Sequence, residues 1–188
     1  MKENKYLKVF TWLLYLIYIG SLAFFIIKQE YMYIGITLFC LISTIILRMC
    51  NKKINNLVNN NLYVVLVAFI LFSSLLGTCY NFYDINHYDD FLHFWSGIIA
   101  CSVGLSIIDF FNTPKQIRDM SKVFIVIFLL MFGVAVGGFW EIMEFGIDNL
   151  LGMHTQAGGL NDTMIDMIDG LLGTIVMMPF AMKKISRY

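Results

Sequence analysis

Apolar runs of about 20 residues recur along the whole chain, and this feature restricts the fold more than any other. One such run crosses the ~30 Å hydrocarbon core of a bilayer as a helix. Hydrophobic residues make up 59% of the sequence and charged residues only 14%. A soluble domain of this length needs more polar surface than that. The sequence therefore predicts an all-α fold, a polytopic membrane helical bundle.

The runs predict a single integral membrane domain, residues 1–188, with about six transmembrane helices. We expect the spans at about 9–27, 31–47, 62–80, 91–111, 123–145 and 163–182. The first run follows a Lys-rich start but is longer than the apolar part of a secretory signal, so we expect a retained helix. The polar segments 51–61 and 113–122 are predicted to be connectors. The four cysteines lie in or at the ends of different runs and are expected to be small apolar fillers.

The basic residues predict the orientation. Six spans place both termini and the two polar connectors on one side of the membrane. Every Lys and Arg except Lys28 falls on that side: Lys2, Lys5, Lys8, Arg48, Lys52, Lys53, Lys115, Arg118, Lys122, Lys183, Lys184 and Arg187. Short cytoplasmic loops are enriched in Lys and Arg. We therefore expect both termini to be cytoplasmic.

The acidic residues have the opposite distribution, which the positive-inside rule does not explain. Only Glu3, Asp109 and Asp119 are on the basic side. The outer half holds all three histidines (His87, His93, His154) and the remaining acids, namely Glu30, Asp84, Asp89, Asp90, Glu141, Glu144, Asp148, Asp162, Asp166 and Asp169.

Three of the predicted helices carry these polar residues on one face each. Asp89, Asp90, His93 and Gly97 share an arc of about 100° on the fourth. On the fifth, a stripe within about 80° begins with the small-xxx-small pair Gly133 and Gly137, which favours close helix packing. The stripe then becomes acidic with Glu141, Glu144 and Asp148, and we expect these carboxylates to point into the bundle.

The sixth helix presents Asp162, Asp166, Asp169 and Gly173 within about 100°. After Asp169 only about thirteen apolar residues follow, too few to cross the bilayer alone. The helix must therefore start near Asp162, which buries Asp166 and Asp169 in the outer third of the membrane. A lipid-facing Asp at that depth costs a few kcal/mol, so we expect internal partners.

Carboxylates gathered in this way either share protons or surround a cation. Carboxylates with a neutral imidazole suit a divalent ion such as Mg²⁺, Mn²⁺ or Zn²⁺. The candidate metal ligands are Asp89, Asp90, His93, Glu141, Glu144, Asp162, Asp166 and Asp169. The candidate catalytic residues are His93, Glu141 and Glu144, and the outer-loop residues His154, Gln156 and Asn161 are candidates for substrate binding.

Simpler roles remain open for several of these residues. Asp89 and Asp90 also suit the N-terminus of a helix, where acids interact well with the helix dipole. His87 is typical of an interfacial loop. Glu141 and Glu144 also suit interfacial acids that point toward water.

Three elements, taken in order, resemble the YjdF-type family of bacterial membrane-spanning proteins. They are D-x-x-H-F (Asp90 to Phe94), W-E-x-x-E (Trp140 to Glu144) and D-x-x-x-D-x-x-D-G-x-x-G (Asp162 to Gly173). The first and last are also similar to the VanZ-like family of Gram-positive envelope proteins, although Asp169 stands where that pattern usually has Asn. The resemblance covers about residues 80–178. It implies a multi-pass protein of the bacterial cytoplasmic membrane, and VanZ-like members are associated with glycopeptide resistance.

Three functions fit these residues. The first is metal-dependent processing of a lipid-linked or envelope substrate at the outer membrane face. The second is a non-catalytic membrane protein of envelope stress, resistance or immunity, whose polar cluster holds the bundle together. The third is an ion-coupled transporter. The lipid bilayer is the expected partner in each case, and no nucleic acid partner is expected.

Overall fold

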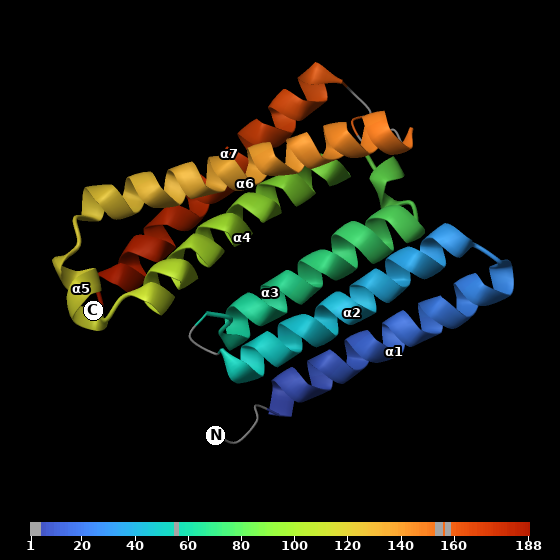
Figure 1. Ribbon diagram of the computed structural model, residues 1–188, viewed down its shortest axis with the longest axis horizontal. Coiled ribbons are helices and arrows are strands. Elements are labelled where there is room, and N and C mark those ends of the chain that lie inside the picture. The colour runs from blue at the N-terminus through green and yellow to red at the C-terminus, as the bar shows by residue number, and fades with distance from the viewer. Residues whose placement is uncertain (1–4, 55–56, 153–155, 157–158) are drawn as a thin grey trace. The chain divides into compact units, whose positions relative to one another are not determined.

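The computed structural model describes residues 5–54, 57–152, 156 and 159–188 (Figure 1). The described residues form helices and turns and no β-strand, which confirms the all-α prediction. Within these residues, six helices are long and apolar enough to cross a membrane: α1 (Lys5–Lys28), α2 (Tyr31–Lys53), α3 (Asn60–Ile70) with its π-helical continuation η1 (Leu71–Cys79), α4 (Tyr88–Phe111), α6 (Lys122–Leu151) and α7 (Leu160–Ile185).

The helices are longer than the predicted spans, because several of the polar residues that flank each apolar run are helical too. Residues 51–53 and 60–61, predicted to belong to a connector, continue α2 and begin α3. The prediction for 113–122 was incomplete, since this segment contains the short helix α5 (Pro114–Asp119). Its signal was present in the sequence: Thr113 and Gln116 form a capping box around Pro114 at the first helical position.

Two compact units are present, Met1–Ile85 and Asn86–Tyr188. In the first unit α2 packs against α1, α3 and η1. Buried hydroxyls join its helices, since the Thr11 Oγ1 and Tyr63 hydroxyl oxygens are 2.9 Å apart and those of Ser21 and Tyr80 are 3.0 Å apart. A short 3₁₀ turn, η2 (Phe82–Asp84), follows η1. Whether the whole chain behaves as one membrane domain stays a prediction.

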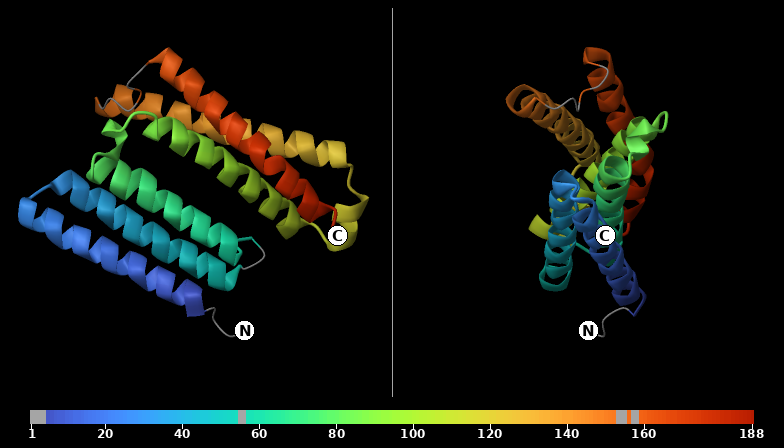
Figure 2. Two further views of the ribbon diagram at one scale, coloured as in Figure 1. Left: turned by 180° about the vertical axis from the view of Figure 1, so that it is seen from behind. Right: turned by 90° about the vertical axis from the view of Figure 1, so that its right-hand side faces the viewer.

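In the second unit α4, α6 and α7 pack against one another (Figures 1 and 2). α4 and α7 run parallel and make the closest contact, whereas α6 runs antiparallel to both. An apolar core fills the end at which α6 begins; its buried members are Cys101, Leu105, Ile108, Ile117, Ile125, Leu129, Ala181 and Ile185.

A polar contact closes this same end of the unit. The Asp109 carboxylate near the end of α4 accepts hydrogen bonds from the Lys184 ammonium and, at 2.9 Å, from the Tyr188 hydroxyl. Burial and the neighbouring carboxylate raise the pKa of Tyr188 to about 12, so the hydroxyl keeps the proton that it donates. Asp109 thereby ties α4 to the C-terminal end of α7.

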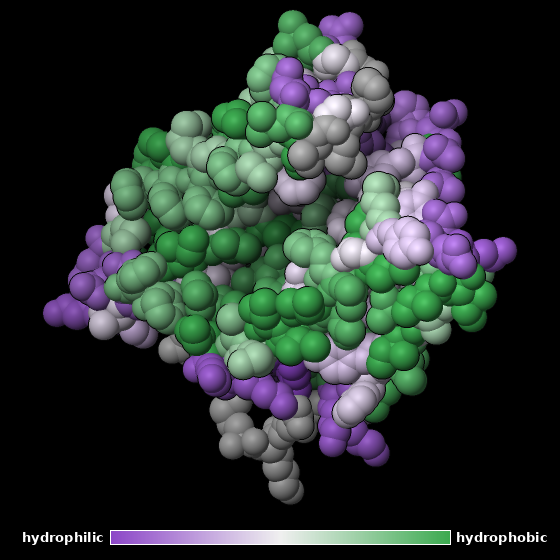
Figure 3. Space-filling view, turned by 45° about the vertical axis from the view of Figure 1, so that its right-hand side comes forward, coloured by the Kyte–Doolittle hydropathy of each residue, from purple (hydrophilic) through white to green (hydrophobic). Residues whose placement is uncertain are grey.

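Large apolar side chains are exposed on α1, α2, α4, α6 and α7, for example Leu16, Phe39, Phe139 and Phe180. Figure 3 shows hydrophobic residues along the middle of the helices that it displays and hydrophilic residues toward their ends. Such a surface suits hydrocarbon and not water. The exposed apolar surface therefore supports the prediction of a multi-pass membrane protein.

Candidate metal centre

Glycines set the distance between α4 and α7. A Cβ added to Gly97 would lie 1.9 Å from the Gly170 carbonyl oxygen, and one added to Gly173 would lie 1.9 Å from the carbonyl oxygen of Phe94. The two backbones are therefore in direct contact, which any larger residue at Gly97 or Gly173 would prevent. The Thr174 hydroxyl fixes the crossing further, since it donates to the Gly97 carbonyl at 3.1 Å.

The same crossing determines which side chains meet. His93 lies one turn before Gly97 on α4, and Asp166 lies one turn before Gly170 on α7. Because α4 and α7 are parallel and cross at these glycines, one turn back on each helix brings His93 and Asp166 to the same level.

The third helix joins at a second close contact. A Cβ on Gly133 of α6 would lie 2.2 Å from the Thr174 hydroxyl oxygen. Glu141 lies two turns after Gly133 on α6, and Asp166 lies two turns before Thr174 on α7. Because α6 and α7 are antiparallel, Glu141 and Asp166 come to the same level. The expectation for Gly137 was wrong, because a Cβ there would meet nothing within 4 Å; only Gly133 makes a close approach.

His93 is the centre of the resulting cluster. Its Nε2 atom lies 3.6 Å from Oδ1 of Asp89 and 3.8 Å from Oδ1 of Asp166, and its Nδ1 atom lies 3.9 Å from Oε1 of Glu141. The imidazole thus faces two carboxylates with one nitrogen and a third carboxylate with the other. The long helices α4, α6 and α7 all contribute.

Two of these carboxylates are almost fully buried. The exposed fraction is 7% for His93, 5% for Glu141 and 2% for Asp166. Both carboxylate oxygens of Glu141 and Oδ1 of Asp166 have no hydrogen-bond partner among the described residues. A buried carboxylate without compensation costs several kcal/mol. The segments 86–114 and 123–182 contain no Lys or Arg. These parts of the second unit therefore supply no Lys or Arg side chain that could neutralise the buried carboxylates.

The distances around His93 are close to those between the ligands of one divalent ion. One oxygen each of Asp89 and Asp166 and one ring nitrogen of His93 lie within 4.8 Å of one another. Carboxylate and imidazole ligands bind Zn²⁺ at roughly 2.0–2.2 Å, so two ligand atoms of one ion are about 3–4 Å apart. The distances from Nε2 of His93 to the oxygens of Asp89 and Asp166 fall in this range. A small inward movement of one carboxylate would bring the distance between the two Asp oxygens into the same range.

The remaining predicted ligands lie outside this group of three. Asp90 Oδ2 lies 2.6 Å from Nδ1 of the exposed His87, and Glu144 accepts a 2.9 Å hydrogen bond from the Trp140 indole. Asp162 and Asp169 are half-buried on α7. Asp89 and Asp90 lie in the first turn of α4, where acids interact favourably with the helix dipole. The N-cap position itself is occupied by His87.

The predicted substrate-binding residues have different outcomes. His154 lies outside the described residues, and Asn161 is exposed in the first turn of α7. Gln156 contacts two helices, since its side-chain amide donates to the Glu141 carbonyl at 3.4 Å and to the Thr163 hydroxyl at 3.0 Å. Its backbone N–H donates to Asp148 at 3.0 Å.

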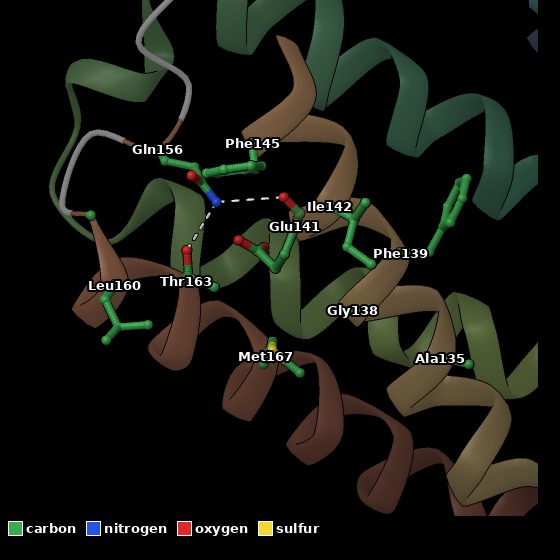
Figure 4. A pocket seen from close by; sticks show the side chains of 11 residues that line it. Ala135, Gly138, Phe139, Glu141, Ile142, Phe145, Gln156, Leu160, Thr163 and Met167 are labelled. Carbon is green, nitrogen blue, oxygen red and sulfur yellow. Dashed lines mark hydrogen bonds between the residues drawn. The ribbon is translucent and has the colours of Figure 1, made fainter. Parts of the chain in front are cut away.

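Sequence reasoning missed a pocket beside this cluster. It has a volume of about 870 Å³ and lies between α6 and α7 (Figure 4). Its lining is mostly apolar and includes Ala135, Phe139, Ile142 and Met167, whereas Glu141, Gln156 and Thr163 supply polar groups. Thr163 carried no sequence signal, because a single Thr in a helix has no pattern. Glu141 belongs to both the pocket and the cluster.

The fold and the cluster define a class: a multi-pass helical membrane protein with a largely buried Asp/His/Asp group and an adjoining, mostly apolar pocket that Glu141 lines. The chain belongs to the family described as "Predicted membrane protein (DUF2238)", which matches residues 10–186. This is the YjdF-type family, so that resemblance is confirmed. The VanZ-like resemblance stays a prediction.

A relative from Thermotoga maritima, an uncharacterised protein, is 31% identical over 123 residues. The match covers 64% of this chain and 62% of the relative, so the chain spans less than two thirds of that protein. No solved structure matches the chain.

Proposed function

We propose that this protein is a membrane-embedded, metal-dependent enzyme that hydrolyses or transfers a phosphoryl or acyl group of a lipid-linked substrate. Asp89, His93 and Asp166 hold one divalent ion, Mg²⁺, Mn²⁺ or Zn²⁺. The main support is the convergence of their ligand atoms within 4.8 Å, together with buried oxygens of Glu141 and Asp166 that lack a hydrogen-bond partner.

The geometry supports a separate role for each group. Nε2 of His93 faces the two aspartates, so it is the ring nitrogen suited to bind the ion, and Nδ1 faces Glu141. Carboxylates placed behind a metal-bound histidine orient its ring. Glu141 also lines the pocket, where it accepts the proton of an attacking water and returns it to the leaving oxygen. A histidine that binds a metal is not free to act as the base, which favours Glu141 in that role.

The apolar end of the unit argues against a transporter. A translocation pathway needs polar groups at every depth of the membrane. Beyond the glycine crossing, the described parts of α4, α6 and α7 instead bury the apolar core around Cys101, Leu105, Ile125 and Leu129. A site that is reached from one side only is consistent with catalysis at one leaflet.

We further propose the plasma membrane of a bacterium as the location, with both termini cytoplasmic. The basic residues of the second unit support this orientation, because all of them lie at the end of the helices opposite to His93. A reporter fused after Tyr188 tests it: green fluorescent protein should fluoresce there, and alkaline phosphatase should be inactive.

The experiment for the metal site is elemental analysis of the purified protein after dialysis against Mn²⁺ or Zn²⁺. We expect about one ion per chain in the wild type and strong loss in His93→Gln and Asp166→Asn. His87→Gln is the matched control, because His87 is exposed at the start of the same helix. Absence of a bound ion, or equal binding by both histidine variants, would contradict the metal site.

The activity is tested with the same proteins in vesicles of bacterial polar lipids. Mass spectrometry of the lipids should detect a cleaved or transferred product with Mn²⁺ and none with EDTA. Glu141→Gln should bind the ion and form no product. An ion that binds with no change in any lipid would favour the non-catalytic alternative, in which the ion stabilises the bundle.

A further inference from the structure

The pocket between α6 and α7 is polar at one end and apolar along the rest. Figure 4 shows Gln156 near Glu141 and Thr163, with Gly138 and Ala135 farther along α6. The apolar lining residues Phe139, Ile142 and Phe145 are more than half exposed. The pocket is therefore a recess in the apolar surface of the second unit and not a closed core cavity.

We propose that this pocket binds the apolar chain of a membrane lipid whose headgroup lies at Glu141, next to His93. The inference rests on the proposed function and names the substrate class: an amphiphile in which an ester joins a long apolar chain to the polar group.

The volume and the lining favour this occupant over water or a polar metabolite. Ligand pockets range from about 300 to 1,000 Å³, and 870 Å³ is large enough for a long chain. Apolar cavities do not hold water, which needs two or more polar partners. The part of the lining formed by Ala135, Phe139 and Met167 offers no such partners.

The polar end supplies the selectivity. Hydrocarbon outside the helices is as apolar as the pocket, so burial of a chain by itself selects nothing within a bilayer. The Glu141 carboxylate, the Thr163 hydroxyl and the Gln156 amide lie where the headgroup begins. They match the boundary between the chain and the headgroup of a lipid, which places an ester beside the Asp89, His93 and Asp166 group.

The probe is phosphatidylglycerol with a photoreactive diazirine in one acyl chain, used with purified protein in excess detergent. Diacylglycerol with the same chain forms the second arm and separates recognition of the chain from recognition of the phosphate. We expect residues 138–145 to be labelled at least fivefold more than residues 127–131 of the same helix, which include the exposed apolar side chains of Ile127 and Met131.

A pair of neighbouring glycines supplies the variant and its control. Gly138→Leu places a side chain in the pocket, where a Cβ meets only Met167 at 3.7 Å. It should reduce the labelling ratio to about one. Gly137→Leu should leave the ratio unchanged, because Gly137 does not line the pocket and its Cβ meets nothing within 4 Å. Equal labelling of both segments in the wild type, or no effect of Gly138→Leu, overturns the proposal.

The two proposals fail separately. Labelling that persists in EDTA and in His93→Gln supports the lipid pocket even if no metal binds. Bound metal without preferential labelling of residues 138–145 leaves the metal centre in place and overturns the lipid pocket.

Discussion

The contact between Gly97 and Gly170 gives the sharpest prediction, since a single methyl group there should disrupt the proposed metal site one turn away. In Gly97→Ala the new Cβ would lie 1.9 Å from the Gly170 carbonyl oxygen and 2.9 Å from the Thr174 nitrogen. Both are backbone atoms, so no side-chain rotation relieves the clash. An ordinary contact begins at 3.4 Å, and α4 and α7 must therefore separate by about 1.5 Å.

The separation has a stability cost and a functional cost. Overpacking of this kind costs ~1–3 kcal/mol, offset by about 1 kcal/mol of improved helix propensity. The distance from Nε2 of His93 to Oδ1 of Asp166 is 3.8 Å, and it should rise to about 5 Å, more than two ligands of one ion can span. We expect metal affinity to fall by at least the ~10–100-fold caused by loss of a supporting residue.

Gly170→Ala is the matched control at the same crossing. Its Cβ would meet only the His93 carbonyl oxygen at 3.7 Å, an ordinary contact. It should keep wild-type metal affinity and gain up to about 1 kcal/mol of stability. The assays are isothermal titration with Mn²⁺ and thermal unfolding in detergent. Wild-type affinity in Gly97→Ala, or equal losses in both variants, would refute the idea that this contact positions the ligands.

Three further predictions follow from the second unit. Mn²⁺ at a hundred times its dissociation constant should stabilise the wild type by about 2.7 kcal/mol, and EDTA or His93→Gln should abolish the shift in the thermal unfolding curve. Thr174→Val should cost about 1 kcal/mol, because its hydroxyl proton is shared between the Gly97 and Gly170 carbonyls; a neutral result in chemical denaturation would argue against that hydrogen bond. Asp109→Asn should weaken the contact with Lys184 and Tyr188 and lower the unfolding temperature while leaving Mn²⁺ titration unchanged, and a change in metal affinity would contradict the separation of the two ends.

The residues that the sequence singled out differ in how far pattern alone could place them. Asp166 was expected to be buried because too few apolar residues follow Asp169 to cross a bilayer, and its exposed fraction is 2%. The same reasoning predicted that Asp169 is buried, but its side chain is only half-buried. Helical periodicity places a residue on a face within several tens of degrees, and neighbours on that face can differ in depth.

Spacing along one helix also leaves open which neighbour a side chain contacts. Asp90 was grouped with His93 at a spacing of three residues, yet it contacts His87 at the same spacing in the opposite direction. Glu144 was grouped with Glu141, yet it bonds Trp140 on its own helix. Helical periodicity allows contacts to neighbours three or four residues away in either direction, and it does not say which of these contacts forms.

The sequence by itself determined the class of fold and the end of the bundle at which the acids gather, because both depend on hydropathy and charge summed over whole segments. It placed His93, Glu141 and Asp166 each on an inward face. Only the tertiary structure decided that these three meet with Asp89, because that depends on the register between helices. The register is set by close contacts between helices at Gly97, Gly133 and Gly173. The residue pattern of a single helix does not specify which part of another helix lies against these glycines.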